Sequence, residues 1–449
     1  MYISQVRLRN IKGFHGAREV DLKLTAPGWT VIAGRNGSGK TSLLHAIALA
    51  LGGPAVARNL VPDFENWVTA GQREAVAQVR FTQDEHAERW SGKGRRPSGE
   101  LWAGLVWTMP EEDRPGYRGL RGLQPSLKEK LEGSKTAATR GPWQDNPAGW
   151  FCAAYGPFRR MVGGTPDAQR LMSNSGPVSR LATLFHEDAS LAEGVGWLIE
   201  QHLRSLERRH GAEELKAVAL AILSDGLLPD DYRIEGVDSD GLWVDSGGHR
   251  FPLREMSDGY RTVAALVVDL IKQIYESYGV LRTEPTPSGL ALTAPGVVII
   301  DEVDAHLHVS WQKRIGGWLK EHFPNVQFIV TTHSPYLCQA ADPGGLIRLP
   351  GPDQFEPPRV VDQGLYERIV YGSGDDAVLS ELFGLDTPYS ERAEKLRAEL
   401  VALEVAVIGG TAGDRAVRRY EQLKRMLTSS PVARAREVLA RMERERDGA

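Results

Sequence analysis

Apolar and polar positions change their spacing several times in the first quarter of the chain. Residues 3–8 and 20–24 alternate between apolar and polar side chains, which predicts two antiparallel strands. Residues 29–33 form a continuous apolar run that is typical of a buried strand. Residues 42–51 then place apolar side chains at helical spacing, and the pair Gly52 and Gly53 is expected to end that helix.

The middle of the chain alternates between strand and helix patterns. Residues 74–81 and 101–107 are predicted strands, whereas 110–148 carries little apolar periodicity and is predicted to be a flexible insertion. Order is expected to return at residues 150–159. The interval 186–228 has apolar residues at three- and four-residue steps and predicts helices. The short segments 232–237, 242–245 and 250–253, with a turn at 246–248, predict a small antiparallel sheet.

The last third begins with strands and ends with helices. Residues 297–300 are all β-branched, as expected for a central parallel strand, and 326–332 and 346–349 are further predicted strands. An amphipathic helix is predicted at 311–322. Beyond residue 375 the pattern is almost entirely helical, with predicted helices at 377–385, 390–407, 414–427 and 432–446.

Composition narrows the class of protein. The chain has 449 residues, 41% hydrophobic and 25% charged, which is ordinary for a globular protein but too long for one compact core. Its net charge of −4 gives no global reason to expect nucleic-acid binding. Cys152 and Cys338 are its two cysteines, so a disulfide framework is excluded and a reducing cytoplasm is expected. We found neither a signal-peptide pattern nor a membrane-spanning run.

A glycine-rich stretch lies between the predicted strand 29–33 and the predicted helix 42–51. Residues 34–41 read Gly-Arg-Asn-Gly-Ser-Gly-Lys-Thr and fit the P-loop pattern G-x-x-x-x-G-K-[ST]. Backbone N–H groups and the positive end of the helix dipole bind phosphate oxygens there, Lys40 reaches the β- and γ-phosphates, and Thr41 is a ligand for Mg²⁺. The predicted nucleotide-binding residues of this loop are Gly34, Asn36, Gly37, Ser38, Gly39, Lys40, Thr41 and Ser42. The sequence therefore predicts ATP and Mg²⁺ as ligands.

Two carboxylates end the predicted strand 297–300. In a P-loop fold, Asp301 is placed beside Mg²⁺ and Glu302 where it can deprotonate the water that attacks the γ-phosphate. His333 follows the next predicted strand, at a position from which an imidazole can hydrogen-bond the γ-phosphate and that water. We predict Glu302, His333 and Lys40 as catalytic residues, and Thr41 and Asp301 as metal ligands.

A second anion-binding element precedes the Asp-Glu strand. Ser257-Asp258-Gly259-Tyr260 stands at the start of a predicted helix rich in small and apolar residues. By itself this is a common N-cap. Its position in the order of motifs makes it informative.

With these motifs in order, the chain resembles ABC-type ATPase heads of the branch that contains RecF, SMC and OLD-like proteins. Residues 9–14 look like the opening of that branch, and the runs at 301–308 and 331–335 look most like the OLD and PtuA subset, PtuA being the ATPase of the Septu anti-phage system. The resemblance implies that Ser257 and Gly259 contact the γ-phosphate bound to a second copy, and that Asp304 lies in a loop at that interface. The implied fold is α/β, an ABC-type P-loop head with a mixed sheet and two lobes, an inserted helical lobe and a C-terminal helical appendage.

This fold predicts five parts. They are an N-terminal lobe with the P-loop at 1–109, a flexible insertion at 110–149, a helical lobe with a β-hairpin at 150–249, a C-terminal lobe at 250–350 and a helical region at 351–449.

The chain departs from the family pattern in three places. Asp258 and Tyr260 are unusual in the Ser-x-Gly motif. In the family a glutamine usually links the metal to the helical lobe. Gln78 is a weak candidate for that glutamine here, and the segment Tyr155-Gly156-x-x-Arg159 is a candidate to take its place. His306 and His308 have a spacing that suits metal ligation, but the resemblance favours interface or packing positions.

Function follows from the resemblance and from what the chain lacks. OLD-family nucleases carry acidic TOPRIM motifs after the ATPase, and nothing after Ala340 offers that pattern; Asp375 and Asp376 stand alone. We therefore expect a cytoplasmic ATPase without membrane contact. It forms a homodimer or an oligomer of dimers on ATP, and it regulates a separate effector, an HNH-type nuclease, in anti-phage defence. Two alternatives stay open: a RecF-like DNA-repair clamp that binds DNA, and a nucleotide-gated scaffold with little turnover.

Overall fold

The computed structural model describes residues 1–110, 124–130, 132–134, 136–159, 165–173, 176–229, 231–287 and 289–427. The chain divides into two compact units, Met1–Tyr366 and Glu367–Ala449. The division lies beyond the predicted boundary at residue 350, because β16 (Arg359–Val360) still pairs with β15 (Leu346–Arg348) in the first unit.

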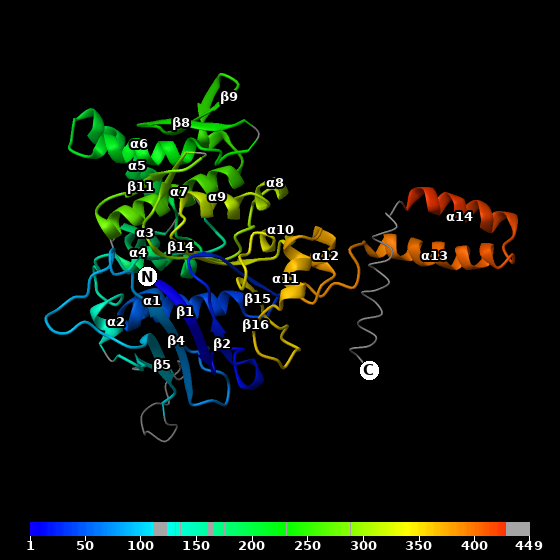
Figure 1. The fold of residues 1–449 in the computed structure, drawn as a ribbon, viewed down its shortest axis with the longest axis horizontal. Helices are drawn as coiled ribbons and strands as arrows, with labels where there is room; N and C mark the ends of the chain where they lie inside the picture. The colour runs from blue at the N-terminus through cyan, green and yellow to red at the C-terminus, as the bar shows by residue number, and fades with distance from the viewer. Residues whose placement is uncertain are drawn as a thin grey trace. The chain divides into compact units, whose positions relative to one another are not determined.

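An antiparallel sheet forms one side of the first unit (Figure 1). Its strand order is β2-β1-β4-β5-β6. The strands are β1 (Tyr2–Arg9), β2 (Val20–Lys23), β4 (Glu74–Thr82), β5 (Leu101–Thr108) and β6 (Ser126–Glu129). The antiparallel pairing predicted for residues 3–8 and 20–24 is confirmed, since Val6 lies opposite Leu22.

A second sheet carries the P-loop strand. Its order is β16-β15-β3-β14-β13-β7, and all its neighbours are parallel except β15 and β16. Besides β15 and β16 it contains β3 (Gly28–Ala33), β7 (Cys152–Tyr155), β13 (Gly296–Ile300) and β14 (Val326–Thr332). Every residue of β13 and β14 is buried, as the apolar runs predicted. The mixed sheets, the P-loop after β3 and the added helices fit the P-loop ATPase head that the sequence predicted.

Helix α1 (Lys40–Leu60) joins the two sheets through the main hydrophobic core. Leu43, Leu44 and Ile47 are almost completely buried in one cluster with residues of both sheets. The fully buried Gln327 of β14 ties the sheets together as well: its side-chain oxygen accepts from the Ile3 N–H at 2.7 Å, and its amide donates to the Ile3 carbonyl at 2.9 Å. A buried amide with both groups paired fixes the position of β1 against the P-loop sheet.

The predicted break of the helix at Gly52 and Gly53 is confirmed, although a further helical stretch that the sequence did not predict follows it. Gly53 adopts a non-helical conformation (φ 82°) that kinks the helix, and Pro54 then starts a further helical stretch. Because Pro54 has no N–H, the Ala50 carbonyl loses its helical donor, and the Trp143 indole N–H donates to it at 2.9 Å instead. Among the described residues, α1 is the single helix long and apolar enough to cross a membrane, and most of that stretch is buried inside the unit, as in many core helices.

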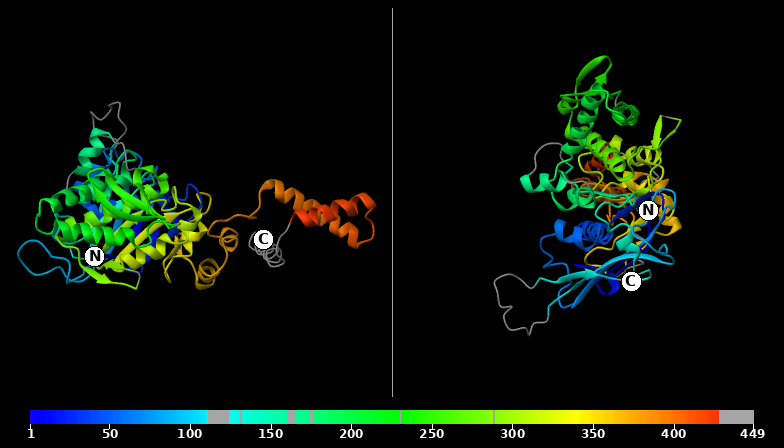
Figure 2. Two further views of the ribbon diagram at one scale, coloured as in Figure 1. Left: turned by 90° about the horizontal axis from the view of Figure 1, so that it is seen from above. Right: turned by 90° about the vertical axis from the view of Figure 1, so that its left-hand side faces the viewer.

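A helical lobe and a three-stranded meander lie at the end of the unit opposite the antiparallel sheet, in green in Figures 1 and 2. The predicted helices within 186–228 and the predicted meander are both confirmed. The elements at this end are α5 (Ala192–Leu206), α6 (Ala212–Ser224), β8 (Arg233–Asp238), β9 (Gly241–Ser246) and β10 (His249–Pro252), followed by α7 (Asp258–Tyr278). Helices α3 (Pro166–Ser173) and α4 (Pro177–Phe185) lie in the middle of the unit, where α4 packs against α1 and β7.

Two further predictions differ from the structure. Part of the predicted flexible insertion is ordered: β6 pairs with β5 and buries Leu127, and α2 (Ala137–Arg140) follows it. Residues 111–123 lie outside the described residues. The predicted helix 311–322 is two helices, α8 (Val309–Gln312) and α9 (Ile315–His322), because the Arg314 N–H bonds the Trp311 carbonyl at 2.8 Å and so tightens and ends the first turn.

Short elements complete the first unit. They are two one-turn 3₁₀ helices (Gly16–Arg18 and Leu253–Glu255), the ribbon β11 (Thr283–Pro285) with β12 (Leu290–Leu292), and α10 (Pro335–Cys338).

The second unit is helical, as predicted. Its elements are α12 (Gly374–Val378), α13 (Glu391–Ile408) and α14 (Asp414–Met426), and α11 (Gln363–Val370) runs across the division between the units. The predicted helix 377–385 instead begins earlier and is short, because Ser373 and Asp376 form a capping box that starts it at Gly374. The predicted helix 432–446 lies outside the described residues.

Candidate functional site

The P-loop is held in place by residues from β1–β2 and from the strand beside β3. The guanidinium of the buried Arg18 donates to the carbonyls of Ser38 at 3.0 Å and Pro350 at 3.1 Å. Gly39 has φ 100°, and a side chain there would meet the Phe14 ring at 2.8 Å. The tight turn and the close aromatic neighbour both require glycine at this position. These contacts fix the conformation of the loop.

Lys40 lies inside this loop. Its ammonium donates to the carbonyls of Gly34 at 2.8 Å and Arg35 at 3.3 Å. Burial lowers the pKa of Lys40, and the nearby carboxylates of Asp301 and Glu302 act in the opposite direction. The Lys40 ammonium is hydrogen-bonded to carbonyls of its own loop. When nucleotide binds, it can exchange these carbonyls for phosphate oxygens, as the P-loop prediction requires.

Asp301 and Thr41 meet at the carboxyl end of β13. The Thr41 hydroxyl donates to Asp301 Oδ2 at 2.7 Å, and Asp301 also accepts a hydrogen bond from the Thr331 hydroxyl. The buried Ser38 hydroxyl lies near Gly34 within the loop and has no hydrogen-bond partner. Adjacent carboxylate and hydroxyl oxygens are the ligand types that Mg²⁺ prefers, so the donor set fits the predicted metal.

Glu302 follows in an unusual backbone conformation. Its φ is 45°, and its N–H donates to Thr331 Oγ1 at 2.7 Å. A left-handed conformation at a residue with a side chain costs about 1–3 kcal/mol and is found mainly where the surroundings enforce it. The structure therefore brings together Lys40, Thr41, Asp301 and Glu302, as the sequence predicted.

Arg159 supports this turn from behind. Its guanidinium is buried and donates to the carbonyls of Asp301 at 2.9 Å and Glu302 at 3.1 Å. Burial lowers the pKa of Arg159 to about 10, while Asp304, Asp301 and Glu302 oppose that shift, so the side chain remains a cation at neutral pH. The segment 155–159 thus reaches the site, as one of the two sequence candidates for the missing glutamine.

Gln78, the other candidate, does not reach it. Gln78 lies on β4 in the antiparallel sheet, and its amide donates to Glu132 at 2.5 Å. The metal hypothesis for His306 and His308 also finds no support. His308 instead caps α8, where its Nδ1 lies 2.9 Å from the Ser310 hydroxyl, and the described residues contain no group of three or more potential metal ligands.

Asp304 and His333 form the neighbouring edge of the site. Asp304 accepts from the Thr332 hydroxyl at 2.6 Å and from the His333 N–H at 3.3 Å. The His333 side chain is exposed at this edge. Asp304 therefore joins the loop after β13 to the turn after β14.

The N-terminus of α7 carries the Ser-x-Gly motif. Ser257 is exposed, and its hydroxyl makes no capping hydrogen bond, while Asp258 pairs with Arg261. A side chain at Gly259 would meet the His306 carbonyl at 2.3 Å. Gly259 is thus required by packing against the loop of its own chain, a constraint that the motif alone did not reveal.

Sequence analysis assigned no role to three residues of the site, although two of them lie in the runs 9–14 and 331–335 that carry the family resemblance. Phe14 and Arg18 act on the P-loop from a turn and a short 3₁₀ helix, and Thr331 joins Asp301 to the Glu302 N–H. Thr331 lies in an apolar strand pattern, and only the Thr-Thr pair before His333 could have pointed to it.

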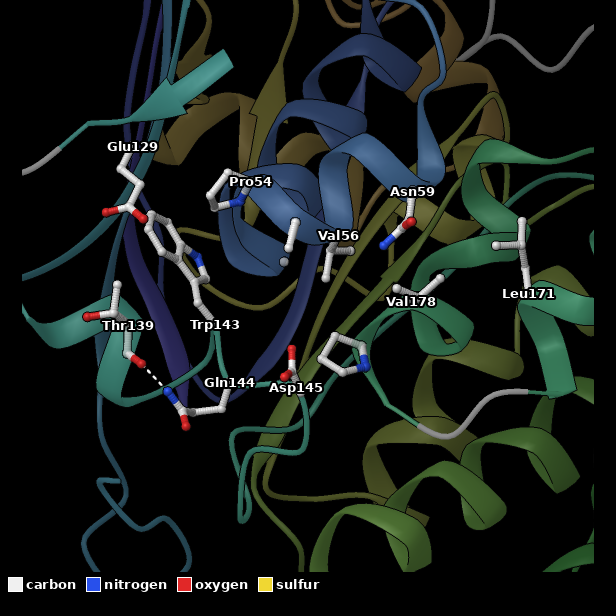
Figure 3. Close-up of a pocket in the computed structure, with 13 residues that line it drawn as sticks. Pro54, Val56, Asn59, Glu129, Thr139, Trp143, Gln144, Asp145, Leu171 and Val178 are labelled. Atoms are coloured by element: carbon white, nitrogen blue, oxygen red, sulfur yellow. Dashed lines mark hydrogen bonds between the residues drawn. The ribbon is translucent and has the colours of Figure 1, made fainter. Parts of the chain in front are cut away.

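A pocket of about 370 Å³ lies elsewhere, beside the kink in α1 (Figure 3). Pro54, Val56, Trp143 and Val178 give it an apolar wall, and Glu129 and Asp145 lie at its rim. None of the predicted site residues lines it. The pocket forms where the Trp143 ring packs against the break in α1.

Two family models match parts of the chain. Residues 200–339 match a family described as "AAA domain, putative AbiEii toxin, Type IV TA system", and residues 5–109 match a family described as "AAA domain". The first range contains Ser257, Asp301 and His333, and the second contains the P-loop.

Curated relatives match over partial lengths. The chain is 36% identical to the "Retron Ec83 probable ATPase" of Escherichia coli over 27% of this chain and 21% of that protein. It is 24% identical to the "Septu protein PtuA" of Bacillus mycoides over 74% of this chain and 38% of that protein, and 28% identical to the Bacillus thuringiensis protein of the same name over 42% and 47%. The matched regions therefore span less than half the length of each of these relatives.

Solved structures also match the chain. An SMC head bound to the C-terminal winged-helix domain of ScpA aligns with a TM-score of 0.47 and 19% identity over 80% of this chain and 98% of that chain. The SMC head domain from Thermotoga maritima aligns with a TM-score of 0.40 and 16% identity over 77% and 94%. The sequence matches and the site geometry together relate the chain to the Septu protein PtuA and to AAA-type, ABC-like P-loop domains.

Proposed function

We propose that this chain hydrolyses ATP, forms an ATP-dependent dimer, and regulates a separate nuclease effector in anti-phage defence from the cytoplasm. The observation that carries the hydrolysis is the convergence of Lys40, Thr41, Asp301 and Glu302 at one edge of the parallel sheet. The similarity to PtuA and to a retron ATPase supports the defence context.

Each residue of the cradle has one task. Gly34, Asn36, Gly37, Ser38, Gly39 and Ser42 present backbone and hydroxyl groups to the phosphates, and Lys40 neutralises the β- and γ-phosphate charge. Thr41 and Asp301 would hold Mg²⁺, which supplies positive charge to the phosphate oxygens when bound. Glu302 orients the attacking water and accepts its proton, and His333 donates a hydrogen bond to the γ-phosphate.

The closing half of the site is proposed to come from a second copy. An exposed Ser257 hydroxyl without a capping bond, at the N-terminus of a 21-residue helix, is free to bind the γ-phosphate of a partner. Because Gly259 has no side chain, the start of α7 packs on the loop that carries Asp304. Through this contact, a movement of α7 at the dimer interface would change the position of Glu302.

Hydrolysis by the purified chain tests the enzyme proposal. We expect Mg²⁺-dependent release of phosphate, loss of ATP binding in Lys40→Ala, and a kcat lower by about 10²–10⁴-fold with binding retained in Glu302→Gln. An unchanged kcat in Glu302→Gln would remove Glu302 as the base.

The effector proposal has a separate test. The chain alone is expected to lack nuclease activity, and a nuclease is expected to co-purify with it. Nuclease activity of the isolated chain, abolished by changing one of its own acidic residues, would contradict an effector on another chain. ATP-dependent DNA binding with a steep dependence on salt would favour a DNA clamp instead.

A further inference from the structure

The buried guanidinium of Arg159 donates hydrogen bonds to three consecutive backbone carbonyls. Its two terminal nitrogens donate to Asp301 at 2.9 Å, to Glu302 at 3.1 Å and to Val303 at 3.5 Å. One nitrogen also donates to the Gly156 carbonyl at 2.9 Å, within its own segment. All of these acceptors are backbone atoms, so the side chain acts on the course of the main chain.

The main chain at residues 301–303 includes the strained left-handed residue Glu302. Consecutive carbonyls of an extended strand point in opposite directions, so they reach one cation only where the strand has ended. Here the left-handed turn at Glu302 (φ 45°) brings them to one side. The planar fork of arginine matches several acceptors at once, whereas the ammonium of lysine is a single point charge.

The same segment is tied to the helix that carries the Ser-x-Gly motif. The Tyr155 hydroxyl donates to Asp269 Oδ2 of α7 at 2.9 Å, and both side chains are buried. A side chain at Gly156 would meet the Thr183 carbonyl of α4 at 2.3 Å. Arg159 is therefore anchored to α4 and α7 on one side and to the Asp301–Val303 turn on the other.

We infer that Arg159 is a positioning residue for Glu302: it holds the turn in the conformation that aims the Glu302 carboxylate at the attacking water. The inference rests on the proposed ATPase function and assigns no contact between Arg159 and nucleotide. ATP binding, which depends on the P-loop, proceeds without it.

Arg159→Lys tests this directly, because it keeps the positive charge and removes the fork. We expect kcat for ATP hydrolysis to fall by about 30- to 100-fold, as for a misplaced catalytic group. The Kd for ATP, measured with a fluorescent analogue, is expected to stay within about twofold, since P-loop contacts are intact. A kcat equal to that of the wild type would overturn the inference.

A double variant separates positioning from general destabilisation. If Arg159 acts through Glu302, adding Arg159→Lys to Glu302→Gln lowers kcat by no more than about twofold beyond Glu302→Gln alone, since coupled residues are not additive. Additive losses would assign Arg159 a separate role and contradict the inference.

Two controls make the result decisive. Arg180→Lys changes another buried arginine, on α4, and is expected to lower the thermal midpoint without changing kcat. Arg159→Gln is a second variant in case Arg159→Lys does not fold. Loss of ATP binding in both Arg159 variants would show a structural role and overturn the inference, whereas absence of hydrolysis in the wild type would overturn the proposed function itself.

Discussion

The two phosphate-binding elements of this chain differ in how completely one chain builds them. The P-loop is enclosed: Arg18 and Phe14 contact it, its own Lys40 bonds across it, and Gly34 and Gly39 are closely fitted to neighbouring atoms. The Ser257–Gly259 element has a fitted glycine as well, but its serine is exposed and its hydroxyl makes no capping hydrogen bond.

This difference separates binding from hydrolysis. When the backbone of the loop is already in place, only the Lys40 ammonium has to exchange its partners on binding, so ATP binding should be a property of the single chain. An exposed helix N-terminus whose serine makes no capping bond can bind an anion, and a γ-phosphate in the cradle of a second copy would supply one. The P-loop is then half of a site that a second chain completes.

The largest effect is expected from Ser257→Arg, which places a bulky cation on the open element. We expect ATP hydrolysis to fall by more than about 100-fold, because the closing contact is lost, while the Kd for ATP changes by less than about threefold. Phosphate release and equilibrium nucleotide binding measure the two quantities. A parallel loss of binding would mean that Ser257 acts on its own chain.

Gly259→Ala sharpens the same comparison from inside the chain. Its Cβ would lie 2.3 Å from the His306 carbonyl, so the start of α7 must move away from the loop after Glu302. We expect hydrolysis to fall by about tenfold and the free energy of unfolding to drop by about 1–3 kcal/mol. Denaturant titration and kcat are the measurements.

Gly196→Ala is the matched control for that variant. This glycine lies on α5 with no atom near its Cβ position, so alanine there should raise helix stability by up to about 1 kcal/mol. If both substitutions gave the same result, packing on His306 would not explain the motif glycine.

Arg18→Met tests whether the P-loop is truly preformed. Removing two charged hydrogen bonds from the Ser38 and Pro350 carbonyls should weaken ATP binding by at least about tenfold, since even one such bond contributes about 1.5–3 kcal/mol and about 1.4 kcal/mol is a factor of ten. Arg9→Met, at an exposed ion pair with Glu74, serves as the control and should leave the Kd unchanged. Wild-type affinity in Arg18→Met would show that the loop holds its own shape.

His45 gives the smallest effect, on stability alone. Burial lowers the pKa of His45 to about 4, below its ordinary value of 6.5, although its Nε2 pairs with the Leu184 carbonyl at 3.0 Å. The folded chain therefore binds this proton less readily than the unfolded chain, and stability present above pH 6.5 is lost as the pH falls toward 4. For a partly exposed imidazole we expect a loss of about 1 kcal/mol by pH 5.

Substitution isolates that contribution. In His45→Gln the difference in unfolding free energy between pH 7 and pH 5 should be smaller than in the wild type by that amount. Identical pH dependence in the two proteins, measured by denaturant titration, would mean that His45 is protonated equally in the folded and unfolded states.

Local patterns predicted the parts of the fold that depend on local physics. The strand 326–332 was predicted with its observed bounds, and the P-loop and the Asp301-Glu302 pair were predicted because their motifs specify both geometry and chemistry. The β-branched run of β13 likewise predicted its central place in the sheet.

Contacts between distant segments account for what was missed. The continuation of α1 past Gly53 depends on Trp143, which follows 93 residues after the Ala50 carbonyl that it satisfies. Arg18 contacts Pro350 across 332 residues, and Arg159 contacts Asp301 across 142. No periodicity or short motif records a partner at such a separation, so these contacts become visible only in the folded chain.

The specific rate of ATP hydrolysis, followed as the protein is diluted while sedimentation reports its mass, tests the half-site claim most directly. The account predicts that the rate per chain falls as the ATP-bound dimer dissociates, and that Glu302→Gln accumulates the dimer in the presence of Mg²⁺ and ATP. A strictly monomeric chain that hydrolyses ATP at the full rate, independent of its concentration, would contradict it.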